Sequence, residues 1–161
     1  MKTETNVMQQ SLSPGNSLLL DAGIAVWAVL PMESPIDTLQ LIEDWRRKGI
    51  RLLAPGLFLS ESTSAIRRLV YGGMLTGDEG EIALNDLLEL EIKIIHETEQ
   101  HCRSAFRWAR RLDQSKAYAG FYLAAAEQTG SPFWTADRRL ANSALKSKVD
   151  WVHWAGDYET T

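Results

Sequence analysis

The sequence predicts an α/β fold in which helices flank a central parallel sheet of about five strands, giving three layers. Five short apolar runs recur along the chain, and longer stretches with helical periodicity separate them. Strands that alternate with helices in this way form parallel sheets. The 161 residues, 45% of them hydrophobic, suffice for one domain with a substantial core and are too few for two ordinary domains.

The predicted strands are the runs SLLLDA, IRLLAP, EIKIIH, PFWTA and VDWVHW, at residues 17–22, 50–55, 91–96, 132–136 and 149–154. A short helix, AGIAVWAV, is expected directly after Asp21. A second helix, in SPIDTLQLIEDWRRKG, should begin at Pro35 behind a Ser34 cap and stop at Gly49. Two helices are expected after the second strand, and Gly72 ends the first of them.

Two more helices should follow the third strand. The first, TEQHCRSAFRWARRLD, has one apolar face and one arginine face, and the arginine face is expected to be solvated. The apolar face contains Cys102, Ala105, Phe106, Ala109 and Leu112, and the arginine face contains Arg103, Arg107, Arg110 and Arg111. The second helix, SKAYAGFYLAAAEQTG, is expected to begin behind Ser115 and to stop at Gly130. A last helix should run from Asp137 to about Lys146.

Charge and cysteine content limit the function classes. Acidic residues outnumber basic ones by 21 to 17, so the chain lacks the overall positive charge of an indiscriminate nucleic-acid binder. The single cysteine, Cys102, excludes an internal disulfide, fits a reducing compartment and is expected to be buried. The opening residues lack the pattern of a signal peptide, and no apolar run approaches membrane-spanning length. We therefore expect a soluble cytoplasmic protein with a flexible leader over 1–16, one domain over 17–158 and a tail over 159–161.

Three acids are expected to meet at one edge of the sheet. Asp21 closes the first strand, Asp137 closes the fourth, and Glu61 lies early in the helix after the second. The carboxyl ends of parallel strands share an edge, where ligand sites form. Each acid also has a structural interpretation, because Asp21 and Asp137 can cap helices and Glu61 can lie at the surface. The apolar surroundings of Asp21 favour a functional role, since a buried carboxylate is costly unless it is paired or bound to a metal.

Clustered carboxylates repel one another, and a divalent cation is the simplest way to keep them ionised. Mg²⁺ or Mn²⁺ is therefore the expected cofactor. Because Mg²⁺ commonly completes its coordination with phosphate oxygens and water, the expected reaction is phosphodiester hydrolysis.

Three segments resemble the PIN-domain nucleases, particularly the toxin subunits of VapBC-type toxin–antitoxin pairs. They are LLLDAGIAVWAVL, APGLFLSESTSAIRRLVYGGMLTGDE and AYAGFYLAAAEQTGSPFWTADRRLANSA, and the resemblance covers residues 17 to 158. It implies metal ligands at Asp21, Glu61 and Asp137, with a hydroxyl at Thr135 that orients a ligand or water. It also implies a PIN-like three-layer fold, an RNA substrate, an antitoxin partner and a homodimer.

One position departs from the family pattern. The family has an aspartate directly after the position of Tyr118, where this sequence has Ala119, and an alanine cannot bind a metal. Gly23, where the family often has a small polar residue, is a milder departure. Losing one anionic ligand should weaken metal binding, and Asp113 is not placed by its spacing to replace it. Reduced or absent hydrolysis is therefore one of the expected outcomes.

The basic residues expected to contact the RNA backbone are Arg67, Arg68, Arg138 and Arg139. Two function hypotheses follow: a metal-dependent endoribonuclease of the toxin type, or a catalytically silent PIN fold retained for binding RNA or a protein. A dinucleotide-binding enzyme is excluded because DAGIAVW lacks a G-x-G-x-x-G motif. A haloacid-dehalogenase-type phosphatase is excluded because it would need an aspartate at Gly23. A zinc site is not expected, because the three histidines lack the spacing of zinc ligands.

Overall fold

One parallel sheet forms the centre of the molecule. In the computed structural model, which describes residues 15–159, five strands lie in the order β3-β2-β1-β4-β5. They are β1 (Ser17–Leu20), β2 (Arg51–Pro55), β3 (Lys93–Ile95), β4 (Phe133–Thr135) and β5 (Val152–Trp154). Each strand lies within a predicted apolar run, so the predicted α/β class is confirmed. Most of the expected leader, residues 1–14, and residues 160 and 161 of the tail lie outside the described residues.

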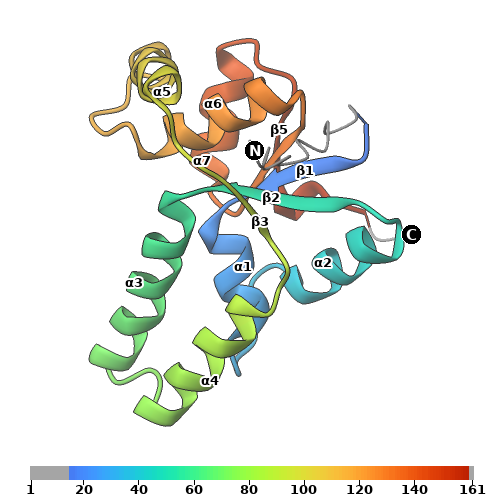
Figure 1. Ribbon diagram of the computed structural model, residues 1–161. Helices are drawn as coiled ribbons and strands as arrows, with labels where there is room; N and C mark the ends of the chain where they lie inside the picture. Colours follow the sequence, from blue (N-terminus) through green and yellow to red (C-terminus); the bar gives the residue numbers. More distant parts are fainter. Residues whose placement is uncertain (1–14, 160–161) are drawn as a thin grey trace, which may run out of the picture.

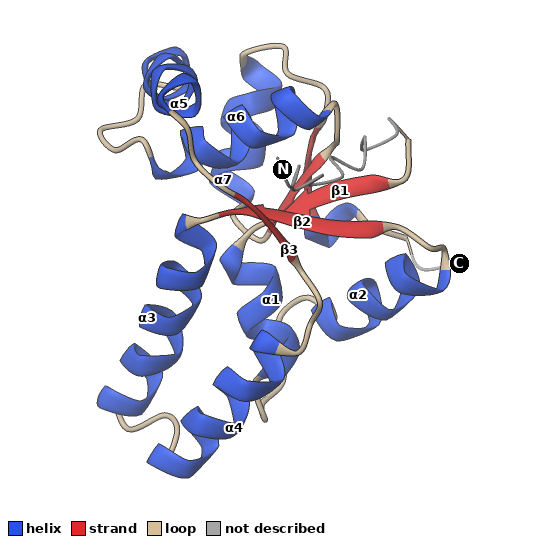
Figure 2. Cartoon of the chain, in the orientation of Figure 1, coloured by secondary structure: helices blue, strands red, loops and turns tan. Residues whose placement is uncertain are grey.

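Helices cover both faces of this sheet (Figures 1 and 2). They are α1 (Ala22–Val29), α2 (Thr38–Arg47), α3 (Leu57–Tyr71), α4 (Gly77–Leu88), α5 (Glu99–Arg111), α6 (Tyr118–Thr129) and α7 (Arg138–Lys146). The first four lie on one face, and α5 to α7 lie on the other, as right-handed crossovers require for this strand order. Over residues 15–159, none of the helices has the length and apolar character needed to cross a membrane.

Two predicted helix starts are wrong because other residues provide the caps. The α2 helix begins at Thr38 and not at Pro35, since the Asp37 side chain accepts a hydrogen bond from the Gln40 N–H at 3.1 Å. The α6 helix follows Ala117 and not Ser115, and no side chain caps it. The predicted stop at Gly130 is confirmed, because this residue has a φ of +61°, which glycine adopts without strain.

The α5 helix is rotated relative to the sequence prediction. Phe106 and Cys102, both expected to be buried, are exposed, whereas Trp108 is buried beside Ala105 and Ala109. A helix with aromatic residues on two sides can bury either, so its periodicity alone does not determine the rotation. At the crossing with α6, a Cβ on Gly120 would overlap the Ala105 carbonyl, so the two helices approach at backbone distance.

The β1 strand lies at the centre of the sheet and is buried along its whole length. It pairs with β2 on one side and with β4 on the other, and the direction of strand order reverses between β1 and β4. Ligand sites in open parallel sheets form at such a reversal, outside the carboxyl ends of the strands. Asp21 follows β1 and Asp137 follows β4 closely, so both acids lie at this reversal.

Candidate metal centre at the sheet edge

Asp21 is held by neutral donors at the carboxyl end of β1. Its Oδ1 accepts a hydrogen bond from the Ile24 N–H at 3.0 Å, which caps α1. Its Oδ2 accepts from the Thr135 hydroxyl, and the Ala136 N–H lies 3.2 Å from Oδ2 and 3.3 Å from Oδ1. The expected capping role is therefore confirmed, and the same carboxylate joins the ends of β1 and β4.

These surroundings disfavour the charged form of Asp21. Burial raises the pKa of this carboxyl, and the nearby charge of Asp137 raises it further, against the hydrogen bonds from Thr135, Ile24 and Ala136 that lower it. Among residues 15–159, neither Asp21, Glu61 nor Asp137 forms an ion pair with a lysine or arginine. The protein thus encloses an acid at this edge without supplying a cation for it.

Glu61 lies beside Asp21, on the second turn of α3. Burial raises the pKa of Glu61, and the charge of Asp21 raises it further, whereas the nearby Tyr122 hydroxyl opposes the shift. The Glu61 Oε1 is buried and completes no hydrogen bond, and the same holds for the Tyr122 hydroxyl. A buried carboxylate oxygen without a hydrogen-bond partner is costly, and a cation bound at this oxygen would offset that cost.

Asp137 has two roles at the end of β4. Its Oδ1 accepts hydrogen bonds from the Arg139 N–H at 2.9 Å and the Leu140 N–H at 3.2 Å, so it caps α7 as expected. Its own N–H donates to the Thr135 Oγ1 at 2.9 Å. Thr135 is fully buried, and its hydroxyl donates to the Asp21 carboxylate while accepting from the Asp137 N–H. It therefore connects the backbone of Asp137 to the carboxylate of Asp21.

The donors at this edge fit a hard divalent cation in their chemistry. Carboxylate oxygens are the ligands that Mg²⁺ and Mn²⁺ prefer, and the Glu61 Oε1 has no hydrogen-bond partner among the described residues. However, within the part of the chain that the structure describes, no group of three or more His, Cys, Asp or Glu side chains lies close enough to form a metal site. Asp21 is the electrostatic neighbour of both Glu61 and Asp137, but the three acids do not form a closed ligand cluster.

Ala119 occupies the first turn of α6, one turn before Tyr122. Residues three apart lie on neighbouring parts of a helix surface, so position 119 is on the side of α6 that carries the Tyr122 side chain towards Glu61. An aspartate there would add a carboxylate next to the cluster. At Gly23, a Cβ would lie 3.0 Å from the Ala136 Cβ, so the glycine allows α1 to approach the end of β4.

The predicted RNA-contacting arginines lie on two helices, with Arg67 and Arg68 on α3 and Arg138 and Arg139 on α7. Arg138 lies over the Trp154 ring, 4.7 Å from its centroid, and Arg67 lies 5.6 Å from the Tyr71 ring on α3. Arg68 is exposed two turns along α3 from Glu61, about 10 Å of helix axis away. Arg139 is exposed in the first turn of α7. The two pairs therefore lie on the helices that follow β2 and β4.

Tyr122 is the residue at this site that sequence reasoning missed. It is buried, stacks on Phe133 with the ring centroids 5.3 Å apart, and has its hydroxyl beside two acids. Burial and the charges of Glu61 and Asp21 raise the pKa of this phenol above its usual range. Its position three residues after Ala119 puts both residues on one side of α6, but the sequence alone does not determine which way that side faces.

Comparisons with known proteins agree with the observed fold. The family model described as "PIN domain" matches residues 18–145. Among solved structures, the chain is similar to PAE2754 from Pyrobaculum aerophilum, with a TM-score of 0.59, 20% identity and coverage of 88% of both chains, which shows a shared fold. A comparison with curated proteins gave no significant match. The chain belongs to the PIN-domain family, whose fold is of the nuclease type.

Proposed function

We propose that this protein is an endoribonuclease that depends on Mg²⁺ or Mn²⁺ and acts as the toxin-like subunit of a toxin–antitoxin pair. The single observation that carries the proposal is the partnerless buried oxygen of Glu61 beside the enclosed carboxylate of Asp21. Proteins of the PIN family generally depend on a divalent metal and bind RNA. The acids of this site would serve the same purpose here.

In this proposal Asp21, Glu61 and Asp137 hold the cation. Once bound, a divalent cation supplies Lewis acidity at the scissile phosphate and lowers the pKa of the attacking water. Thr135 and the Ala136 N–H keep the Asp21 carboxylate fixed, which avoids reorganisation during the reaction. In-line attack of water on phosphorus breaks the bond to the 3′ oxygen and leaves a 5′-phosphate and a 3′-hydroxyl. The exposed arginines of α3 and α7, namely Arg67, Arg68, Arg138 and Arg139, would contact the RNA backbone.

Ala119 supports a second candidate function, a PIN fold with impaired catalysis that is retained for binding RNA or a protein. The first turn of α6 lacks the family's aspartate, and the remaining acids do not form a closed ligand cluster within residues 15–159. Both features should weaken cation binding.

A protein partner, either an antitoxin or a second copy of the chain, is part of the proposal. Large apolar side chains are exposed along α3, α4 and the turn between them: Tyr71 is 83% exposed, Met74 61% and Ile82 60%. Exposed apolar groups on adjacent elements favour a protein interface. Size-exclusion chromatography with light scattering, comparing the natural protein with Tyr71→Ser, would test whether this hairpin pairs two copies.

The deciding experiment is cleavage of an end-labelled, unstructured RNA in Mg²⁺ and in Mn²⁺. It compares the natural protein with Ala119→Asp and with Asp21→Asn, which serves as the control for contaminating nuclease. Cleavage by the natural protein but not by Asp21→Asn, with 5′-phosphate product ends, would support the nuclease. Cleavage by Ala119→Asp alone would support the impaired fold. If no variant cleaves, the nuclease proposal fails.

A further inference from the structure

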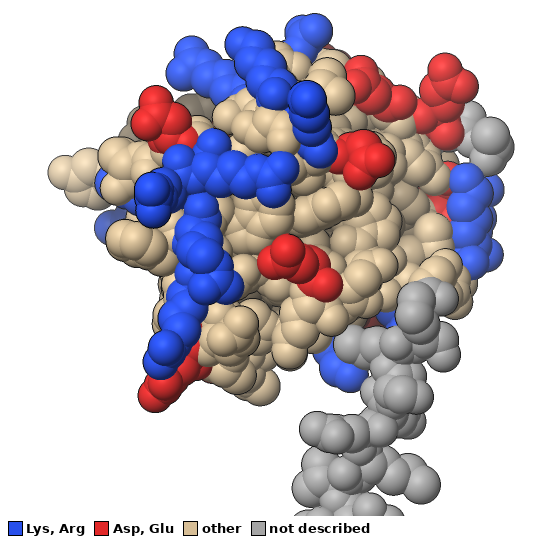
Figure 3. All heavy atoms as spheres, turned by 90° about the horizontal axis from the view of Figure 1, so that it is seen from above, with Lys and Arg blue, Asp and Glu red and all other residues tan. Residues whose placement is uncertain are grey.

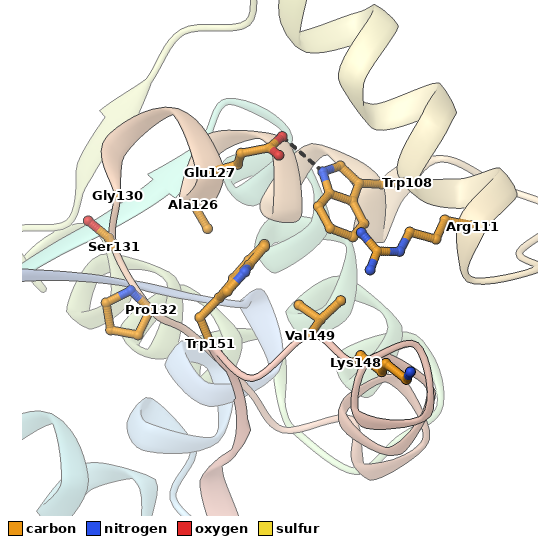
Figure 4. Close-up of a pocket in the computed structure, with 10 residues that line it drawn as sticks. All are labelled: Trp108, Arg111, Ala126, Glu127, Gly130, Ser131, Pro132, Lys148, Val149 and Trp151. Carbon is orange, nitrogen blue, oxygen red and sulfur yellow. Dashed lines mark hydrogen bonds between the residues drawn. The ribbon is translucent and has the colours of Figure 1, made fainter.

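A hollow lies at the opposite end of the sheet from Asp21. It has a volume of about 460 Å³, within the range of roughly 300–1,000 Å³ that is usual for small-molecule sites. Its walls include Pro132 and Trp151, which precede β4 and β5, and Trp108 and Arg111 from α5 (Figure 4). The hollow thus lies at the amino ends of β4 and β5, whereas the carboxyl end of β4 forms part of the acidic edge.

The chemistry of the hollow combines flat apolar rings with positive charge. The Trp108 and Trp151 rings meet edge to face with centroids 5.5 Å apart, and the Arg111 guanidinium lies 4.9 Å from the Trp108 ring centroid. Lys148 adds a second cation, exposed and without an ion pair in the described chain. The acid in the lining, Glu127, uses its Oε2 to accept from the Trp108 indole N–H and the Ser104 hydroxyl. The lining therefore holds two cations against one carboxylate, and aromatic rings with this excess of positive charge suit a planar ring that carries an anionic group.

A row of arginines on α5 leads into this hollow. Arg103, Arg107 and Arg110 are exposed, and Arg107 lies one turn before Arg111 at the rim of the hollow. Only Arg103 has an acidic partner among the described residues, Glu99. Figure 3, which views this face from above, shows Lys and Arg side chains gathered on the side of the molecule where α5 lies. Because the chain has a net charge of −4, this concentration of positive charge is local.

Phe106 lies within the arginine row and is 70% exposed. An exposed phenylalanine between arginines provides a stacking surface for an unpaired base, while the arginines provide contacts for phosphates. A polyanion with exposed planar rings satisfies both features. A double helix does not, since its bases are stacked on each other and cannot enter the hollow.

We propose that single-stranded RNA binds along the outer face of α5, with its backbone against the arginine row and one nucleotide in the hollow between Trp108, Trp151 and Lys148. The choice of RNA rests on the proposed function, whereas the preference for a single strand rests on the hollow and on Phe106. This proposed surface on α5 is separate from the acidic edge. It includes none of the arginines expected at that edge, which are Arg67, Arg68, Arg138 and Arg139.

The first test is fluorescence anisotropy with a labelled ten-nucleotide oligouridine, in EDTA so that binding is measured without cleavage. Phe106→Ala should weaken binding by about tenfold, as expected for one lost base stack. Arg107→Gln and Arg111→Gln should each weaken it several-fold and reduce the salt slope by about 0.7. Lys148→Asn should act similarly, and asparagine suits the φ of +58° at this position. Lys93→Gln, an exposed cation on β3, is the matched control and should leave binding unchanged.

The second test addresses the hollow directly, by titrating adenosine monophosphate into ¹⁵N-labelled protein. The indole N–H signals of Trp108 and Trp151 should shift, while that of Trp27, which lies on α1 across the sheet, should not. Equal binding by the α5 variants and the Lys93→Gln control would overturn the proposal, as would equally tight binding of a duplex or unshifted Trp108 and Trp151 signals. RNA binding that depends on α5 without any cleavage in Mn²⁺ would refute only the nuclease. Cleavage with undiminished binding by the variants would refute only this surface.

Discussion

Two carboxylates are enclosed by this protein in opposite electrostatic surroundings. Asp44 on α2 is 1% exposed and lies 2.8 Å from the Lys48 Nζ and 2.9 Å from an Arg47 nitrogen, and it accepts a hydrogen bond from Tyr158. The hydrogen bond from Lys48 is the largest cause that lowers the pKa of Asp44, followed by that from Tyr158. Asp21 receives only neutral donors and has acids as neighbours, and its pKa is raised.

The difference separates a structural acid from a candidate functional one. The protein supplies the counter-charge of Asp44, which connects α2 to the end of the chain at Tyr158. It supplies no lysine or arginine for Asp21 among the described residues, so a counter-charge there would have to come from a bound ligand. Acids with a shifted pKa and no cationic partner in the protein are typical of functional sites, whereas acids paired with a lysine or arginine are typical of structural networks.

The largest effect is expected on RNA cleavage, measured for two single variants in which either Asp21 or Asp44 is replaced by asparagine. Asp21→Asn should reduce cleavage by at least roughly 100-fold, because even indirect partners of a metal are worth about 10–100-fold. Asp44→Asn, the matched control, should retain cleavage at a temperature where it is folded. Equal losses in both variants would remove the distinction between the two acids.

Restoring a carboxylate at position 119 should sharpen the contrast further. Ala119→Asp should bind Mn²⁺ at least about tenfold more tightly than the natural protein, since it adds an anionic ligand beside Glu61 and Asp21. Isothermal titration calorimetry would measure this affinity. Ala119→Asn, with the same shape but no charge, should give a much smaller gain, and a gain as large as that of the aspartate would contradict an anionic site.

Thermal stability should change in the opposite order. In metal-free buffer at neutral pH, Asp44→Asn should lower the Tm by several degrees, whereas Asp21→Asn should leave it unchanged or raise it. The stabilisation by Asp44 is present above its unfolded pKa of 3.8 and is lost as the pH falls through its lower folded pKa. The difference in Tm between the natural protein and Asp44→Asn should therefore disappear in acid. Asp37→Asn is the control, because asparagine caps α2 as well as aspartate does. A Tm difference that persists below both the folded and the unfolded pKa of Asp44 would contradict a stabilising role for its charge.

The smallest effect is expected at Tyr122. Its buried hydroxyl completes no hydrogen bond, and such a group costs about 1–3 kcal/mol, so Tyr122→Phe should raise the Tm slightly. Differential scanning calorimetry would detect the change. Tyr158→Phe, which removes a hydroxyl that donates to Asp44, should lower the Tm, and the same sign in both variants would show that the two hydroxyls do not differ in role.

The strands and helices could be predicted from the sequence because apolar runs and helical periods are local signals. The acids that follow β1 and β4 could also be placed, since parallel topology brings the ends of these strands together. Tyr122 and Phe106 could not be placed, because the direction of each side chain depends on the rotation of α6 and α5 about their axes. That rotation is set by packing, including the close approach of the two helices at Gly120.

The pairing of β1 with β4 has a consequence during protein synthesis. The Asp21 carboxylate is held by Thr135 and Ala136, which follow it by 114 and 115 residues. At about 5–20 residues per second, a ribosome needs roughly 6 to 23 seconds to add that stretch. The acidic edge therefore cannot assemble until most of the chain has been translated. The proposed nuclease would therefore stay inactive until its own translation is nearly complete.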